Sequence, residues 1–243
     1  MTFSIVARDP RTGMLGVGTS SKALATGAMV PYVRAGVGAI ASQSFTNPYL
    51  GIDGLTLLEQ GLTAARALEK LIDGDRGREL RQVAVVDGDG NTAAYTGSRC
   101  IDWAGAVEGG GYVCVGNIIT GEEVVKAMAS AFASSADQPL PERLLLALEA
   151  GQDAGGYRRG RQAAGLVVVD TQEYPVCDLR VDDHPDPLVE LRRLYEVYER
   201  EMAPYVQGMP RRDDYTPYWD AVLQVRDAIE SSLEEEAAAV KES

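Results

Sequence analysis

The chain has 243 residues, of which 45% are hydrophobic and 24% are charged, a composition typical of a globular protein with one large core or two small ones. Its formal net charge of −13 argues against a protein that binds nucleic-acid phosphates through clustered Lys and Arg. No apolar run approaches the roughly 18 residues of a membrane helix, and no charged segment with an apolar run behind it opens the chain. We therefore expect a cytoplasmic protein that binds neither nucleic acid nor membrane.

The first predicted elements are two strands that form a hairpin. Thr2–Arg8 alternates between its two faces as a half-buried strand does, residues 9–13 have the composition of a turn, and Met14–Lys22 is the second strand. Met1 precedes a residue as small as Thr, a context in which the initiator Met is normally removed. The hairpin would then begin with a free α-amine on Thr2.

The elements that follow alternate between strand and helix periods. After an irregular stretch at Ala23–Tyr32, we expect Val33–Ser44 to be one buried strand and Asp53–Asp73 to be one helix with a leucine stripe. A second hairpin joins Gln82–Asp87 to Thr92–Thr96. The remaining predicted elements are strands at Trp103–Glu108, Gly111–Asn117, Ala163–Asp170 and Val176–Asp182, and helices at Gly121–Ser134, Leu140–Gln152 and from Pro187 to about Met202.

This order of elements predicts an α+β fold class. Runs of antiparallel strands separated by helices favour sheets that face each other under a helical cover. We expect residues 1–202 to form this domain, and residues 203–243 to form a linker, a C-terminal helix from Thr216 and an acidic tail. The apolar stripe of that helix can pack on the core or on a second subunit, and we expect a homo-oligomer, in the simplest case a dimer.

Several segments, in one order along the chain, together resemble a known family. They are Thr2–Asp9, Leu15–Lys22, Val30–Tyr32, Ala35–Gln43, Thr46–Pro48, Ala154–Gly156, Arg159–Gln162 and Asp178–Pro185. The family that they resemble is a prokaryotic domain of unknown function placed in the N-terminal nucleophile (Ntn) hydrolase superfamily. The resemblance runs from Thr2 to about Leu194, and it implies a four-layer αββα sandwich of two stacked, mainly antiparallel sheets.

Thr2 is the candidate nucleophile. A Thr hydroxyl needs an adjacent base, and an α-amine with a pKa of about 8 is a base attached to the same Cα. Such a site would hydrolyse the amide bond of a small-molecule amide or carboxylate substrate without a cofactor or a metal. The first alternative is a degenerate Ntn-fold protein that binds a small metabolite or a protein partner, and the second is an enzyme assisted by Lys22 that needs no free N-terminus.

Four further residues are candidates for supporting roles. Asn47 and Asn117 follow predicted strands and could donate to an oxyanion, although Asn beside Pro or Gly also suits a turn. Ser21 and Lys22 end the second strand of the hairpin and could return close to Thr2, Ser21 as a substrate contact. The Lys22 charge could lower the pKa of the amine or the hydroxyl, or it could simply be solvated.

Arg159 and Arg161 are the candidate substrate-binding cations. They lie in a glycine-rich segment and could clamp a carboxylate or phosphate, or form a basic turn. Members of the resembled family tend to carry Asp where this chain has Tyr157 and Ser where it has Ala163, so altered or lost activity stays an alternative.

The only histidine, His184, follows Asp182 and Asp183. These three residues could hold a divalent ion, but neighbours on an extended strand point to opposite faces, which makes one shared site awkward. Capping of the following helix and bonding to Arg180 is the expected role, and no metal site is predicted.

Overall fold

The computed structural model of the chain is described for residues 1–231, except 158, 216–218, 220–221, 224–225 and 228–229. It divides into two units, Met1–Leu191 and Arg192–Ser243. The C-terminal helix and acidic tail expected from Thr216 lie largely outside the described residues. The domain boundary expected at residue 202 stays a prediction.

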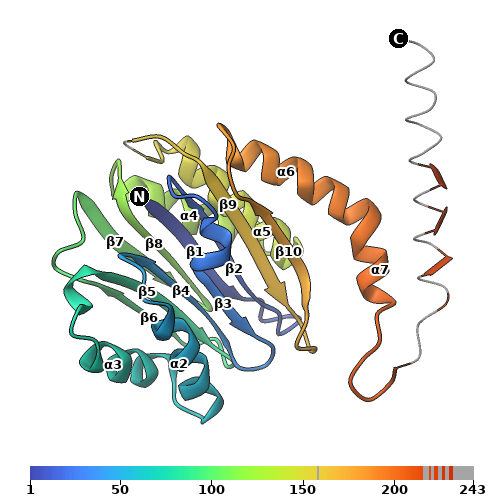
Figure 1. Ribbon diagram of the computed structural model, residues 1–243, viewed down its shortest axis with the longest axis horizontal. Coiled ribbons are helices and arrows are strands. Elements are labelled where there is room, and N and C mark those ends of the chain that lie inside the picture. Colours follow the sequence, from blue (N-terminus) through green and yellow to red (C-terminus); the bar gives the residue numbers. More distant parts are fainter. Residues whose placement is uncertain (158, 216–218, 220–221, 224–225, 228–229, 232–243) are drawn as a thin grey trace. The chain divides into compact units, whose positions relative to one another are not determined.

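Six antiparallel strands form the first sheet, in the order β10-β9-β2-β1-β8-β7. They are β1 (Thr2–Arg8), β2 (Leu15–Ser21), β7 (Trp103–Gly109), β8 (Tyr112–Ile119), β9 (Ala163–Val169) and β10 (Pro175–Val181). The N-terminal strand β1 lies inside this sheet, between β2 and β8 (Figure 1). The predicted N-terminal hairpin is confirmed, and the start of the chain is held on both sides by other strands.

Four antiparallel strands form the second sheet, in the order β3-β4-β5-β6. They are β3 (Pro31–Arg34), β4 (Gly38–Ser44), β5 (Arg81–Asp87) and β6 (Thr92–Thr96). The expectation of one strand over Val33–Ser44 was wrong, because the chain reverses inside it. Gly36 has a φ of +69°, and the Val37 N–H donates to the Arg34 carbonyl, so this glycine closes a turn between two strands.

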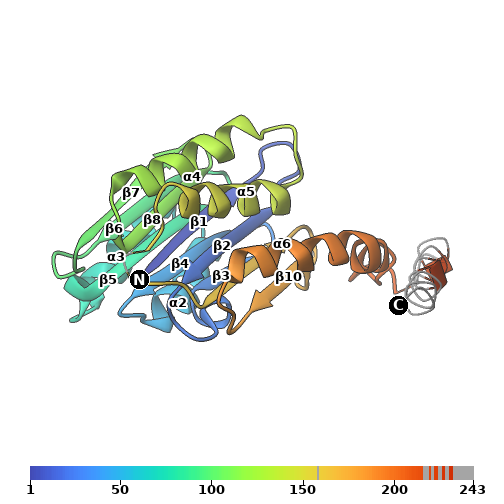
Figure 2. The same ribbon diagram turned by 90° about the horizontal axis from the view of Figure 1, so that it is seen from above.

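Helices cover the outer faces of both sheets. Helices α4 (Glu122–Ser134) and α5 (Leu140–Asp153) pack on the first sheet, and α2 (Pro48–Glu59) and α3 (Ala64–Gly74) pack on the second. Figure 2 shows α4 and α5 on one side of the strand layers and α2 on the other. The four-layer αββα sandwich of an α+β fold is thereby confirmed.

The single helix expected over Asp53–Asp73 is in fact two helices. Gly61 takes a φ of +89°, which ends α2, and the chain turns before α3 begins. The remaining short elements are α1 (Thr26–Met29), a 3₁₀ turn (Arg78–Leu80), α6 (Pro187–Val197), a π turn (Tyr198–Met202) and α7 (Ala203–Gln207). Helix α7 occupies part of the stretch expected to be a linker. Within the described residues, every helix falls short of the length and apolarity that a membrane span requires.

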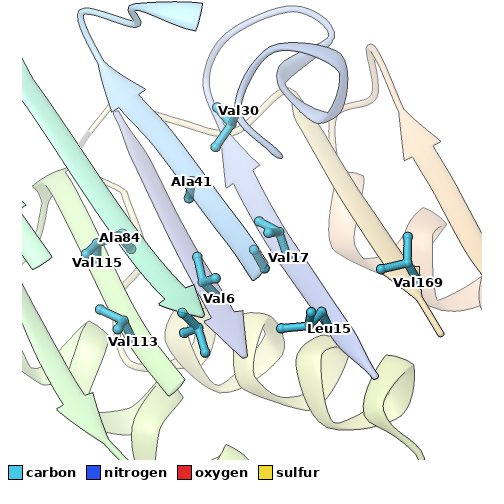
Figure 3. Packing of buried hydrophobic residues seen from close by; sticks show 11 residues of the cluster. Val6, Leu15, Val17, Val30, Ala41, Ala84, Val113, Val115 and Val169 are labelled. Carbon is cyan, nitrogen blue, oxygen red and sulfur yellow. The ribbon is translucent and has the colours of Figure 1, made fainter. Parts of the chain in front are cut away.

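The space between the sheets is filled by small and β-branched side chains. Figure 3 shows Val6, Val17 and Val113 from the first sheet in one cluster with Ala41 and Ala84 from the second. All of them are fully buried, and burying a valine side chain stabilises the fold by about 1.5 to 3 kcal/mol. This apolar layer holds the two sheets together, and buried polar side chains gather toward the N-terminal end of β1.

Candidate functional site

The inter-sheet face of β1 changes from apolar to polar toward the start of the chain. Because strand side chains alternate, Thr2 and Ser4 face the same way as the core residue Val6. In the register of the sheet, Thr2 lies directly opposite Ser21 on β2 and directly opposite Asn117 on β8. Three of the predicted site residues therefore stand side by side in one row at the end of the first sheet.

The Thr2 hydroxyl is buried and hydrogen-bonded while Met1 is attached. Thr2 Oγ1 lies 3.0 Å from Ser21 Oγ, and Thr2 is only 7% exposed. The Ser21 hydroxyl donates to the Met1 carbonyl at 2.5 Å, and the Lys22 N–H donates to the same carbonyl at 3.3 Å. The Met1 carbonyl thus accepts hydrogen bonds from both the Ser21 hydroxyl and the Lys22 N–H, which lie next to Thr2.

Two buried glutamines of the second sheet complete this polar layer. Gln43 and Gln82 lie directly opposite each other on β4 and β5, and the Gln43 side-chain nitrogen donates to Gln82 Oε1 at 2.8 Å. Gln43 also accepts from the Ser4 hydroxyl at 2.6 Å and donates to the Thr2 carbonyl at 3.4 Å. Sequence reasoning missed both residues, although each continues the alternation of an apolar strand with a polar side chain on its buried face.

Gln82 connects the second sheet to Asn117. Its side-chain nitrogen has acceptors in the Gly116 carbonyl at 2.8 Å, Thr96 Oγ1 at 3.0 Å and the Gly105 carbonyl at 3.2 Å. Its oxygen accepts from Asn117 Nδ2 at 3.0 Å. The other side-chain atom of Asn117, Oδ1, is buried and has no hydrogen-bond partner among the described residues.

Arg159 carries a charge that acts on the α-amine at the start of the chain. Burial lowers the pKa of the Met1 α-amine, and the Arg159 charge lowers this pKa further. The Arg159 side chain is 62% exposed and lies 3.9 Å from Asp102 Oδ2, so its guanidinium is largely open to solvent. Its sequence neighbour Arg158 lies outside the described residues.

Arg161 has a different environment. Its guanidinium donates to Asp186 Oδ2 at 2.7 Å and to the Pro185 carbonyl at 3.3 Å. This ion pair ties the glycine-rich segment to the residues just before α6. A substrate carboxylate would have to compete with Asp186 for Arg161, whereas the contact of Arg159 within the described residues is the longer one to Asp102.

Among the described residues, the side chains of Lys22 and Asn47 make no hydrogen bond to the row of Thr2, Ser21 and Asn117. Lys22 follows the end of β2 and is exposed, and its ammonium group makes no hydrogen bond or ion pair with any residue in the described ranges. Asn47 caps α2: its Oδ1 accepts from the Tyr49 N–H at 3.1 Å, and its Nδ2 donates to Asp75 at 3.1 Å. It borders a groove of about 470 Å³ between α2 and α3. The oxyanion role predicted for Asn47 stays a prediction, and both of its polar atoms have structural partners.

The segment around His184 has local hydrogen bonds. The Asp186 N–H donates to His184 Nδ1 at 3.0 Å, and Gln162 donates to Asp183 at 3.0 Å. Arg180 pairs with Asp178 at 3.6 Å. In the part of the chain that the structure describes, no group of three or more His, Cys, Asp or Glu side chains is arranged to hold a metal ion.

Tyr157 and Ala163, the two positions at which the resemblance led us to expect Asp and Ser, lie on opposite faces of the first sheet. Tyr157 stacks on Phe3, with ring centroids 4.7 Å apart, and because Phe3 alternates with Thr2 this stack is on the helix side. The Tyr157 hydroxyl is buried, which raises its pKa. Ala163 lies opposite Ser21 and extends the row of Thr2 by one strand. Of the two positions, only Ala163 stands on the same face as the Thr2 hydroxyl.

Comparisons with solved structures show two similar chains. A crystal structure of a DUF1028 protein from Silicibacter pomeroyi is 32% identical, with a TM-score of 0.82, and the match covers 89% of this chain and 98% of that one. Anbu (ancestral beta-subunit) from Yersinia bercovieri is 11% identical, with a TM-score of 0.37, and the match covers 81% of this chain and 96% of that one. None of the curated proteins matches the chain significantly.

The family comparison covers most of the first unit. Residues 2–191 match the Family of unknown function (DUF1028), so the family of unknown function that the sequence motifs indicated is confirmed. The chain belongs to this family, and its predicted nucleophile is the first residue of the matched range.

Proposed function

We propose that the protein is an amidohydrolase of the N-terminal nucleophile type, in which Thr2 attacks a small-molecule amide after Met1 has been removed. The observation that carries this proposal is the placement of the Thr2 hydroxyl 3.0 Å from Ser21 Oγ, in a buried polar row at the end of an otherwise apolar inter-sheet layer. Buried polar groups cost stability unless they are paired, so a cluster of them at a strand end favours a functional role.

Removal of Met1 would change this row in two ways. It would turn the nitrogen of Thr2 from a peptide nitrogen into an amine with a basic lone pair, and it would release Ser21 from the Met1 carbonyl. The atoms that Met1 covers would become accessible, which matters because Thr2 is almost fully buried while Met1 is present.

The chemistry then follows from these groups. As Thr2 Oγ1 bonds to the amide carbon, its proton moves to the α-amine, and the amine returns a proton to the leaving nitrogen when the carbon–nitrogen bond breaks. Water attacks the resulting ester and gives its proton to the amine, and the acid leaves as Thr2 Oγ1 takes a proton back. Each turnover consumes one water and one amide and releases one acid and one amine.

The substrate that we propose is a small amide that carries a carboxylate. Arg159 supports this choice, because its exposed guanidinium acts electrostatically on the amine at the start of the chain. We also propose that the protein acts in the cytoplasm as a homo-oligomer, in the simplest case a dimer, and that the reaction needs no cofactor.

Intact-mass analysis and two variants test the assignment. We expect the purified protein to lack Met1, and N-acyl and carbamoyl compounds to release acid or ammonia in its presence. Thr2→Ala should reduce turnover by about a thousandfold or more with the fold intact, and Thr2→Ser should keep measurable turnover. Full turnover in Thr2→Ala would reject Thr2 as the nucleophile.

A second candidate function is binding of a small metabolite without chemistry. The burial of Thr2 under Met1 favours it, because a retained Met1 leaves a peptide nitrogen in place of the base. Retained Met1, together with ligand binding that Thr2→Ala leaves unchanged, would support this function. Turnover with Met1 retained would instead favour an enzyme assisted by Lys22, which Lys22→Ala would then inactivate.

A further inference from the structure

Asn117 Oδ1 is a buried acceptor without a partner next to the proposed nucleophile. Asn117 is fully buried, and none of the described residues donates a hydrogen bond to this oxygen. Leaving a polar atom of this kind unpaired in the interior is costly in free energy. Such an atom indicates a donor that joins the site in the working protein.

The orientation of the Asn117 amide is fixed by its neighbours. The Gln82 side-chain nitrogen faces three acceptors, so the Gln82 oxygen must be the atom that faces Asn117. The Gln82 oxygen can only accept a hydrogen bond, so the Asn117 atom that faces it must be the donor Nδ2. The distance from Asn117 Nδ2 to Gln82 Oε1 is 3.0 Å. Exchanging the two Asn117 atoms would bring two oxygens together, and Oδ1 is therefore the atom that stays available.

The strand ladder brings the Thr2 nitrogen to the same side. Hydrogen bonds in an antiparallel pair alternate, and the Lys22 N–H donates to the Met1 carbonyl. The next residue, Thr2, therefore directs its main-chain nitrogen away from β2 and toward β8, where Asn117 is its direct partner and the ladder pairs this single N–H with the Asn117 main-chain carbonyl. Removal of Met1 would replace one N–H at this position by an ammonium with three donors.

We propose that Asn117 Oδ1 is the acceptor that holds the α-amine of Thr2 in the chain without Met1, with Gln82 as the positioning residue that sets the Asn117 orientation. This inference rests on the proposed function, because the amine exists only after Met1 is removed. It gives Asn117 an accepting role in place of the oxyanion donation that the sequence suggested, since its amide nitrogen already donates to Gln82.

Few charges surround the Thr2 amine, so the effect of Asn117 on the pKa of the amine can be measured with little interference from other groups. The side chains of the polar layer from β1, β2, β4, β5 and β8 are uncharged; they are Thr2, Ser4, Thr19, Ser21, Gln43, Gln82 and Asn117. Tyr157 adds a buried hydroxyl on the opposite face of the sheet, and Arg159 is the cation whose charge acts on the start of the chain. A change at Asn117 should therefore shift the titration of the amine directly.

The experiment measures the α-amine titration from its rate of acylation by acetic anhydride at a series of pH values, read by intact mass. Asn117→Ala removes the acceptor, destabilises the ammonium, and should lower the pKa of the amine by about one pH unit. Asn117→Asp is close in shape but places an oxygen against Gln82 Oε1 in place of the donating nitrogen. Its negative charge should raise this pKa by about one unit or more. Ser20→Ala, on the helix side of β2, is the control and should leave it unchanged.

The outcomes separate this inference from the proposed function. Shifts of opposite sign in the two Asn117 variants support the inference, since a merely structural role would not reverse sign. If Asn117→Ala does not fold, the upward shift in Asn117→Asp decides alone. If the protein lacks Met1 and turns over substrate through Thr2, but the Asn117 variants leave the pKa of the amine unchanged, this inference is overturned and the proposed function stands. Retained Met1 in the active protein overturns both.

Discussion

Thr2 and Ser21 end neighbouring antiparallel strands with their hydroxyl oxygens 3.0 Å apart, and both side chains enter the space between the two sheets. The two residues are 19 positions apart in the sequence, and the tight hairpin of β1 and β2 brings them together. Because the two hydroxyls are hydrogen-bonded, Ser21 can orient Thr2 Oγ1 or pass a proton to it.

Ser21→Ala should weaken the proposed activity. The substitution removes the hydrogen-bond partner of Thr2 Oγ1, and a buried hydrogen bond of this kind contributes about 1 to 3 kcal/mol, so kcat/KM should fall roughly ten- to a hundredfold. The matched control is Ser20→Ala, one residue earlier on the same strand and facing the helices. Steady-state kinetics of both variants check this, and equal losses in the two would remove Ser21 from the site.

Gln82→Leu should destabilise the fold. It leaves the Gly116 and Gly105 carbonyls without their side-chain donor, and it takes away the acceptor of Gln43 and Asn117. Several buried groups lose partners at once, so the free energy of unfolding should fall by about 3 to 5 kcal/mol.

Urea unfolding measures this loss, and Gln162→Leu is its control. Gln162 makes one exposed side-chain hydrogen bond, to Asp183, and its replacement should change the free energy of unfolding by less than about 1 kcal/mol. A similar small effect of Gln82→Leu would show that the polar layer contributes little to stability.

Asp75 should make stability depend on acid pH. The hydrogen bond from the Arg81 guanidinium, with others from Asn47 and Gly77, lowers the pKa of Asp75 from 3.8 to about 2. Because the pKa of Asp75 is lower in the folded state, the ionised carboxylate stabilises the fold at pH values above the unfolded-state pKa of 3.8. This contribution is lost as the pH falls toward 2. The free energy of unfolding should exceed that of Asp75→Asn at pH 6, and the difference should shrink by about 2 kcal/mol near pH 2.

The measurement is urea unfolding of both proteins from pH 6 to pH 2. Asp53→Asn, at an exposed position of α2, should keep the wild-type pH dependence and is the control. A difference between wild type and Asp75→Asn that stays constant over this range would contradict the assigned role of the Arg81 pair.

Two errors show where local pattern stops being informative. The strand expected over Val33–Ser44 and the helix expected over Asp53–Asp73 each contain a glycine at positive φ, Gly36 and Gly61. A glycine of this kind is equally compatible with an uninterrupted element, because a missing Cβ permits a turn without requiring one. Packing of the flanking segments in the second sheet and its helices decided both cases.

The candidate site was only half visible in the sequence. Thr2 and Ser21 could be related because a short hairpin joins them, and Asn117 could be named because it ends a strand. Gln43 and Gln82 looked like ordinary strand residues, since nothing local shows that they face the first sheet. Their hydrogen bonds with each other and with Asn117 and Ser4 exist only because the two sheets stack.

Local sequence pattern was enough to predict the α+β class and the N-terminal hairpin, because alternation and turn residues act over a few neighbouring positions. Thr2 became the candidate nucleophile through the family resemblance of the segments around it. Three features became visible in the folded chain: β1 lies between β2 and β8, Asn47 caps a helix, and Asn117 Oδ1 has no partner among the described residues. These features depend on which strands pair and which faces meet, and buried hydrogen-bonding groups are satisfied or left open by contacts between segments far apart in the chain.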